Sequence, residues 1–129
     1  MLWISRSLIG LVLFFNLESA LVFLWNPQDY VAGFGVQGAV GNAIIRSIGL
    51  LFVMWNVPYL VAFLHPIKHR ASLVEAIAMQ TIGVLGETVL LFSLAPGLLE
   101  INNTLSRFIW FDSGGLVCLG IALWLVRKR

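Results

Sequence analysis

The stretch TIGVLGETVLLFSLAPG, residues 81–97, is a long apolar run that carries a single charged side chain, Glu87, and ends in a proline–glycine pair. A helix that crosses a lipid bilayer needs about 20 predominantly apolar residues. The rest of the chain has the same character: of its 129 residues, 60% are hydrophobic and 11% are charged, and the mean hydropathy is +0.95. Soluble domains are about 25% charged. We therefore expect an integral membrane protein.

Four apolar segments have the length that a bilayer crossing requires, at about residues 2–25, 43–64, 72–95 and 105–126. Breaks rich in proline, glycine and polar residues separate them, and Asn42 and Thr104 are typical helix N-caps. Because the linkers are short, sequential helices should pack as neighbours. The predicted fold is all-α: an integral membrane four-helix bundle with up-down-up-down topology, formed by a single domain over residues 1–129. The first segment is too long for a signal peptide, so we expect it to be retained.

The basic residues predict how the bundle is oriented, because cytoplasmic loops of membrane proteins are enriched in lysine and arginine. With the N-terminus inside, the cytoplasmic side holds Arg6, Lys68, Arg70, Arg127, Lys128 and Arg129. The outer side then holds only Arg46 and Arg107. Both termini are therefore expected in the cytoplasm, and the loops over residues 26–42 and 96–104 are expected on the outer side.

This topology predicts a layer of charged side chains in the outer half of the bilayer. Its members are Glu18, Arg46, Glu87, Arg107 and Asp112. At about 1.5 Å per helical residue, the carboxylates lie roughly 10 to 12 Å below the outer boundary and the arginines roughly 3 to 5 Å below it. Asn56 and Gln80 add amide groups to the apolar spans, and Gly83 allows a neighbouring helix to come close to Gln80. Together these polar residues form the candidate ligand- or proton-binding site.

The charge balance of this layer bears on its role. Three carboxylates and two guanidiniums carry a net charge of −1 when all are ionised. Burial disfavours an uncompensated charge, so we expect one carboxyl to be protonated. Such a layer can hold a proton, bind a cation or receive the polar head of an amphiphile. The alternative is an internal salt-bridge network that only fixes the helix arrangement, with Glu87 paired to Arg46.

Metal, thiol and nucleic-acid chemistry are not indicated. HPIKHR, residues 65–70, contains two histidines four residues apart, but Pro66 lies between them and no third ligand is nearby in the sequence. We expect this turn to contact lipid phosphates and to bind no metal or haem. Cys118 is the single cysteine, which excludes an internal disulfide. No cofactor is expected, and the net charge of +2 is explained by orientation signals rather than by nucleic-acid binding.

Two segments resemble a known group of proteins. IRSIGLLFVMWNVPYLVAF, residues 45–63, and MQTIGVLGE, residues 79–87, are similar to the small four-helix DoxX-like bacterial membrane proteins. The resemblance covers the order of helices over the whole chain and these two segments in detail. It implies a multi-pass protein of the bacterial inner membrane, and some members of the group are associated with quinone-linked redox complexes. The chain lacks the glycine-to-lysine pattern expected in their first helix, so no functional residue is carried over.

Three function classes are compatible with these features. The sequence favours a ligand-binding or accessory module that uses the charged layer to bind an amphiphilic small molecule such as a quinone. The second class is a proton- or ion-coupled carrier, which with four helices requires an oligomer. The third is a membrane enzyme acting on a lipid-soluble substrate, with Glu18, Glu87 or Asp112 as general acid or base. The expected partners are membrane lipids, a second copy of the chain or a larger membrane complex.

Overall fold

A computed structural model of the chain describes residues 2–127. Its long helices are α1 (Leu2–Trp25), α2 (Gly38–Leu64), α3 (Arg70–Ser93) and α4 (Leu99–Arg127). Two short 3-10 helices, η1 (Pro27–Asp29) and η2 (Ala32–Phe34), lie in the connection between α1 and α2. Residues 2–127 contain no strand. Lys128 and Arg129, which belong to the predicted cytoplasmic end, lie outside the described residues.

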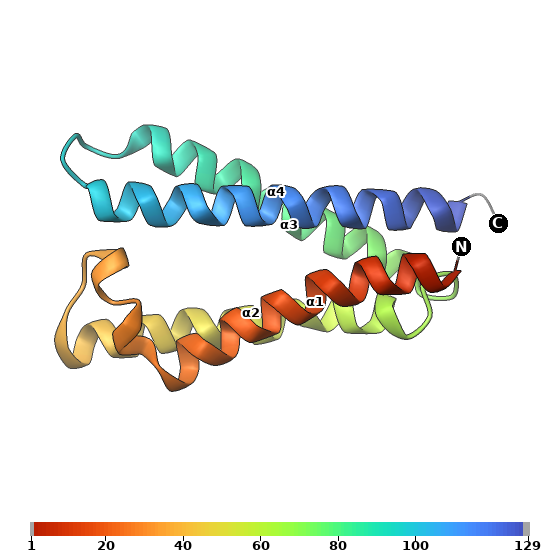
Figure 1. Cartoon of the computed structure of the whole chain (residues 1–129), viewed down its shortest axis with the longest axis horizontal. Helices are drawn as coiled ribbons and strands as arrows, with labels where there is room; N and C mark the ends of the chain where they lie inside the picture. The colour runs from red at the N-terminus through yellow and green to blue at the C-terminus, as the bar shows by residue number, and fades with distance from the viewer. Residues whose placement is uncertain (1, 128–129) are drawn as a thin grey trace.

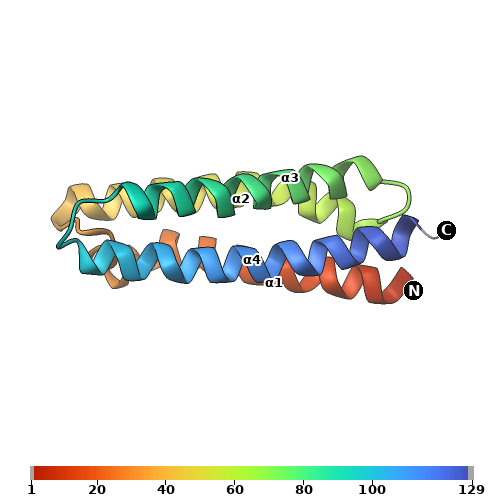
Figure 2. The ribbon, with the colours of Figure 1, turned by 90° about the horizontal axis from the view of Figure 1, so that it is seen from above.

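The helices run alternately in opposite directions, so that each packs antiparallel to the next one in sequence (Figure 1). Contacts join α1 to α2, α2 to α3, α3 to α4 and α4 back to α1, which closes the bundle. Figure 2 shows the pair α1 and α4 lying beside the pair α2 and α3. α1 begins and α4 ends at the same end of the bundle, whereas η1 and η2 lie at the opposite end, here called the loop end.

Each of the helices α1 to α4 has the length and the apolar composition needed to cross a membrane. Large apolar side chains are exposed on their outer faces, including Trp3, Phe14, Ile82 and Phe92. Exposing such an extensive apolar surface to water is unfavourable, whereas lipid tails accept it. The expectation of an all-helical chain with four helices able to cross a membrane is therefore confirmed.

Two helices begin earlier than the sequence pattern predicts. α2 begins at Gly38 and α4 at Leu99, so Asn42 and Thr104 lie inside helices and are not N-caps. The hydroxyl of Thr104 instead donates a hydrogen bond to the main-chain oxygen of Gly33 at 2.6 Å, which ties η2 to α4. The added helical turns satisfy backbone groups that an irregular loop would leave unpaired close to lipid.

The core changes character along the bundle. The half nearest the start of α1 is built mainly from aliphatic residues: Ile9, Val12, Leu13, Tyr59, Ala62, Leu73, Ala76, Leu119 and Ala122. Toward the loop end the interior is aromatic, and Phe23 has its ring centroid 4.5 to 6.3 Å from those of Tyr30, Phe34, Phe52 and Phe108. Because these rings come from α1, α2, α4 and the connection after α1, they hold that connection against the bundle.

α1 and α2 are joined by a reciprocal contact near their ends. Nε of Arg6 in α1 donates a hydrogen bond to the main-chain oxygen of Phe63, the penultimate residue of α2, at 3.1 Å. Nε of Arg46 in α2 donates to the main-chain oxygen of Leu24, the penultimate residue of α1, at 3.2 Å. A cation is favourable beside the last carbonyls of a helix, where the helix dipole is negative. Each helix of this pair therefore caps the other.

Candidate functional site

A chain of hydrogen-bonded side chains crosses the interior between α2, α3 and α4. The hydroxyl of Tyr59 donates to Oε1 of Gln80 at 2.5 Å and has a second acceptor, the main-chain oxygen of Ala76, at 3.2 Å. Nε2 of Gln80 donates to Oδ1 of Asp112 at 2.9 Å and to the main-chain oxygen of the same residue at 3.2 Å. Tyr59 and Gln80 are buried, and their polar atoms are paired as an apolar medium requires.

Two glycines make room for this polar chain. A Cβ at Gly83 would lie 2.7 Å from Oδ2 of Asp112, and a Cβ at Gly115 would lie 2.8 Å from Nε2 of Gln80. The relationship is reciprocal, because each helix presents a polar side chain to a glycine of the other helix. On both helices the glycine follows the polar residue by three positions, so the two lie on one face. α3 and α4 are thus interlocked at a point of close approach.

Asn56 and Glu87 each keep one buried oxygen without a hydrogen-bond partner in the part of the chain that the structure describes. Nδ2 of Asn56 donates to the main-chain oxygen of Phe52 at 2.7 Å, while its Oδ1 is unpaired. Glu87 is half-buried, and its unpaired atom is Oε2. An unpaired buried polar atom costs roughly 1 to 3 kcal/mol. Together with Oδ1 of Asn102, these oxygens are the buried side-chain atoms of the described chain that can accept a further hydrogen bond.

Within the described residues, the members of the predicted charged layer are not joined by ion pairs. Arg46 is exposed and bonded to a main-chain carbonyl of α1, while Glu18 and Arg107 are exposed on α1 and α4. Over residues 2–127, no ion pair joins an arginine of the layer to one of its carboxylates. Hydrogen bonds bring together only Gln80 and Asp112 among the predicted site residues. Equal depth in a bilayer does not determine which face of its helix a residue occupies, and Glu18, Arg46 and Arg107 face outward.

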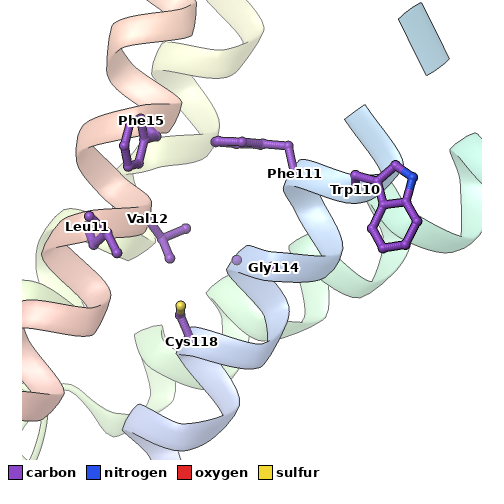
Figure 3. A pocket seen from close by; sticks show the side chains of 8 residues that line it. Leu11, Val12, Phe15, Trp110, Phe111, Gly114 and Cys118 are labelled. Atoms are coloured by element: carbon purple, nitrogen blue, oxygen red, sulfur yellow. The ribbon is translucent and has the colours of Figure 1, made fainter. Parts of the chain in front are cut away.

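A groove of about 290 Å³ lies between α1 and α4, midway along both helices (Figure 3). It is lined by Leu11, Val12, Phe15, Trp110, Phe111, Gly114, Gly115 and Cys118. Phe15 and Phe111 point toward one another across it, with ring centroids 6.2 Å apart, and the thiol of Cys118 points into it. The lining is almost wholly apolar, so the groove suits an aliphatic ligand.

The groove and the polar chain meet at a single residue. Gly115 lines the groove, and a Cβ on it would lie 2.8 Å from Nε2 of Gln80 and 3.3 Å from Cγ1 of Val12. Gly115 therefore borders both the apolar groove and the buried amide of Gln80. The hydrogen bonds of Gln80 hold α3 against α4 beside this part of the groove.

The histidine-containing turn lies at the end of the bundle opposite the loop end. The main-chain nitrogen of Lys68 donates to Nδ1 of His65 at 3.2 Å, and that of His69 donates to the main-chain oxygen of His65 at 2.9 Å. Within residues 2–127, no group of three or more His, Cys, Asp or Glu side chains is placed to hold a metal ion. The geometry of this turn is that of an exposed connection between α2 and α3.

Tyr59 and the groove are absent from the site predicted by sequence. Tyr59 stands within an apolar span, and a buried tyrosine hydroxyl usually has a hydrogen-bond partner, so its position is a usable signal for a polar network. The groove residues offer no such signal. On α4, Phe111, Gly114 and Cys118 share one face at helical spacing, which is equally typical of an ordinary core.

Comparison of the chain with protein-family models, with curated proteins and with solved structures finds no match. A function must therefore be argued from the geometry of the bundle. The two features that bear on it are the polar chain from Tyr59 to Asp112 and the apolar groove between α1 and α4.

Proposed function

We propose that the chain is a membrane-embedded module that binds an amphiphile by its aliphatic tail, in the groove between α1 and α4. The observation that carries this proposal is the groove itself, which is concave, almost wholly apolar and located midway along two helices able to cross a membrane. Ligand sites are typically concave, mostly apolar and about 300 to 1,000 Å³ in volume. At about 290 Å³ the groove is suited to a tail rather than to a whole lipid.

The module is oriented with the start of α1 and the end of α4 on the cytoplasmic side of a bacterial inner membrane. Support for the orientation comes from the basic residues of the described chain that lie toward that end: Arg6, Lys68, Arg70 and Arg127. Arg46 and Arg107 lie in the half nearer the loop end. Support for a bacterial membrane comes from the resemblance of residues 45–63 and 79–87 to DoxX-like proteins.

The polar chain serves as a rigid support for the groove. The hydrogen bonds from Gln80 to Asp112 fix α3 against α4, and Gln80 lies against Gly115, which lines the groove. Buried and fully paired polar groups hold helices in one arrangement. Because the wall is organised before a ligand arrives, tail binding does not have to offset the entropy of ordering the helices.

Two glycines of α4 provide a matched test. A Cβ at Gly114 or at Gly120 would meet no atom within 4 Å, but only Gly114 lines the groove. Gly114→Leu should therefore fill the groove and Gly120→Leu should not, while both variants keep the helix contacts. The wild type, reconstituted with a phospholipid that carries a photoreactive diazirine in its acyl chain, should be crosslinked within residues 11–15 and 110–118.

Mass spectrometry of the crosslinked peptides gives the result. Gly114→Leu should lower labelling of these segments several-fold, and Gly120→Leu should match the wild type. The sole cysteine provides a second readout, because Cys118 should react more slowly with a membrane-permeable maleimide when lipid is bound than after delipidation. Equal labelling of the two glycine variants would exclude the groove as the binding site.

A further inference from the structure

Two side chains of opposite charge flank the groove on the side nearer the loop end. Glu18 of α1 and Arg107 of α4 are both exposed, and neither forms a hydrogen bond or an ion pair within the described chain. Glu18 follows Phe15 by three residues, and Arg107 precedes Phe111 by four. Residues three or four apart share a helix face. Both charges therefore lie on the same faces of α1 and α4 as the aromatic rings that meet across the groove.

The contacts between α1 and α4 place these charges at nearly the same depth. Two contacts set the antiparallel register: Ser5 Oγ donating to Ala122 O at 2.7 Å, and Val12 lying against the Cβ position of Gly115. Ser5 and Val12 are seven residues apart on α1, and Ala122 and Gly115 are seven residues apart on α4, so the two contacts define the same antiparallel register. Continuing this register puts Glu18 level with Ile109, two residues from Arg107. At about 1.5 Å per residue, the difference in depth is about 3 Å.

Exposed tryptophans indicate how deep the pair lies in the bilayer. Trp3 and Trp124 lie level with one another in the same register, are 75% and 53% exposed, and are typical of anchors at a membrane interface. If one boundary of the hydrocarbon core lies at Trp3 and Trp124, a core of about 30 Å spans about 20 helical residues. The opposite boundary then lies at about residue 23 of α1 and about residue 104 of α4. Glu18 and Arg107 then lie about 4 to 8 Å inside that boundary, within reach of a lipid head group.

We infer that the bound amphiphile is a zwitterionic phospholipid with a primary amine, whose phosphodiester contacts Arg107, whose ammonium contacts Glu18 and whose acyl chain lies in the groove. This inference rests on the proposed function and specifies its ligand. A guanidinium presents paired N–H donors that match phosphate oxygens. A carboxylate accepts hydrogen bonds from a primary ammonium, which has three N–H donors, whereas a quaternary ammonium has none. A charge inside the hydrocarbon boundary is costly, so both side chains gain from such a partner.

Other occupants suit these charges less well. A neutral quinone head group carries no charge to compensate Glu18 or Arg107. A second copy of the chain, related by a two-fold axis, would pair Glu18 of each copy with Arg107 of the other. The groove beside the two charges is concave, however, and a concave apolar site suits a flexible tail better than the convex face of a helical bundle.

The test measures which phospholipids the full chain retains. Protein in mild detergent is incubated with equal amounts of phosphatidylethanolamine, phosphatidylcholine and phosphatidylglycerol with identical acyl chains, and native mass spectrometry records bound lipid. Glu18→Gln and Arg107→Gln each remove one charge. Glu75→Gln and Arg70→Gln remove exposed charges of α3 away from the groove and serve as matched controls.

The wild type should retain phosphatidylethanolamine about tenfold better than phosphatidylcholine, as expected for hydrogen bonding to one charged group. Glu18→Gln should lose this preference while still binding both lipids. Arg107→Gln should weaken retention of all three phospholipids by about tenfold, because each of them has a phosphodiester. The two α3 variants should behave as the wild type does.

Three results would overturn the inference. The first is equal retention of the three lipids by the wild type, and the second is an unchanged preference in Glu18→Gln. The third is a wild-type dimer that either charge variant dissociates, which would assign the charges to a second copy. Gly114→Leu separates these failures from failure of the proposed function. If Gly114→Leu retains its lipid, the groove is not the site; if it loses lipid while Glu18→Gln keeps the preference, only the head-group assignment is wrong.

Discussion

Oδ2 of Asp112 lies 2.7 Å from the point at which any residue other than glycine at position 83 would place its Cβ. The carboxylate is held there because its other oxygen, Oδ1, accepts a hydrogen bond of 2.9 Å from Nε2 of Gln80. Asp112 therefore has little freedom to move away from α3. Gly83 and Asp112 form one packing unit, because a substitution at either position changes the steric contacts of the other.

Gly83→Ala should destabilise the bundle by about 1 to 3 kcal/mol, the usual cost of overpacking a closely packed site. Gly86→Ala is the control on the same helix, because a Cβ at Gly86 would meet nothing within 4 Å. That control should be neutral or stabilising by up to about 1 kcal/mol, owing to the higher helix propensity of alanine. Unfolding of the purified variants in detergent, followed by circular dichroism, measures both effects.

The double variant tests the coupling directly. In an Asp112→Ala background the clash with Oδ2 is gone, so Gly83→Ala should cost far less than it does in the wild type. If Gly83→Ala costs the same in both backgrounds, the carboxylate and the glycine are not one packing unit.

Tyr59→Phe should destabilise the protein by about 1 to 3 kcal/mol, because it leaves Oε1 of Gln80 buried without the donor that it has in the structure. Tyr30→Phe is the matched control. Tyr30 is half-buried against Phe23, and no hydrogen bond of its hydroxyl is formed within residues 2–127. Equilibrium unfolding of the two variants should therefore differ, and equal stability would argue against a structural role for the polar chain.

Glu87→Gln should leave the melting temperature within a few degrees of the wild-type value at both pH 5 and pH 8. The reason is that Oε2 of Glu87 has no partner within the described chain, while Arg46 is bonded to the main-chain oxygen of Leu24. Removing the charge therefore leaves no arginine unpaired. Breaking a buried salt bridge costs about 3 to 5 kcal/mol. A marked fall in melting temperature at both pH values would thus show that Glu87 is paired in the membrane.

The proposed orientation predicts a pattern of accessibility. In a Cys118→Ser background, single cysteines placed at Gln28 and Lys68 occupy exposed positions at opposite ends of the bundle. A membrane-impermeant maleimide added to intact cells should label the cysteine at position 28 and leave the one at position 68 unlabelled. Asn102, near the loop end, should behave like position 28. The reverse pattern would invert the orientation and the assignment of the outer half.

The sequence by itself determined the number and the approximate bounds of the helices. Four runs of about 20 apolar residues are enough to predict four membrane-spanning helices. The reason is that a backbone in lipid must satisfy its own hydrogen bonds, and a helix does so within one segment. The sequence also predicts at what depth each residue lies, since depth along a helix depends only on position in the chain. It therefore identified Gln80 and Asp112 as polar groups inside the span. It did not locate the starts of α2 and α4, which begin at Gly38 and Leu99, before the predicted N-caps Asn42 and Thr104.

Only the tertiary structure decided which polar residues meet. Contact depends on how each helix is rotated about its own axis, and hydrophobicity does not mark the inner face, because lipid and core are both apolar. The rotation is determined by interhelical packing, such as Asp112 against Gly83 and Gln80 against Gly115. That packing joins Gln80 to Asp112 and leaves Glu18 facing outward, although Glu18 has nearly the depth that the sequence assigns to Asp112. The depth of a residue follows from its position along its own helix, whereas the direction in which its side chain points about the helix axis is determined by the packing of the whole bundle.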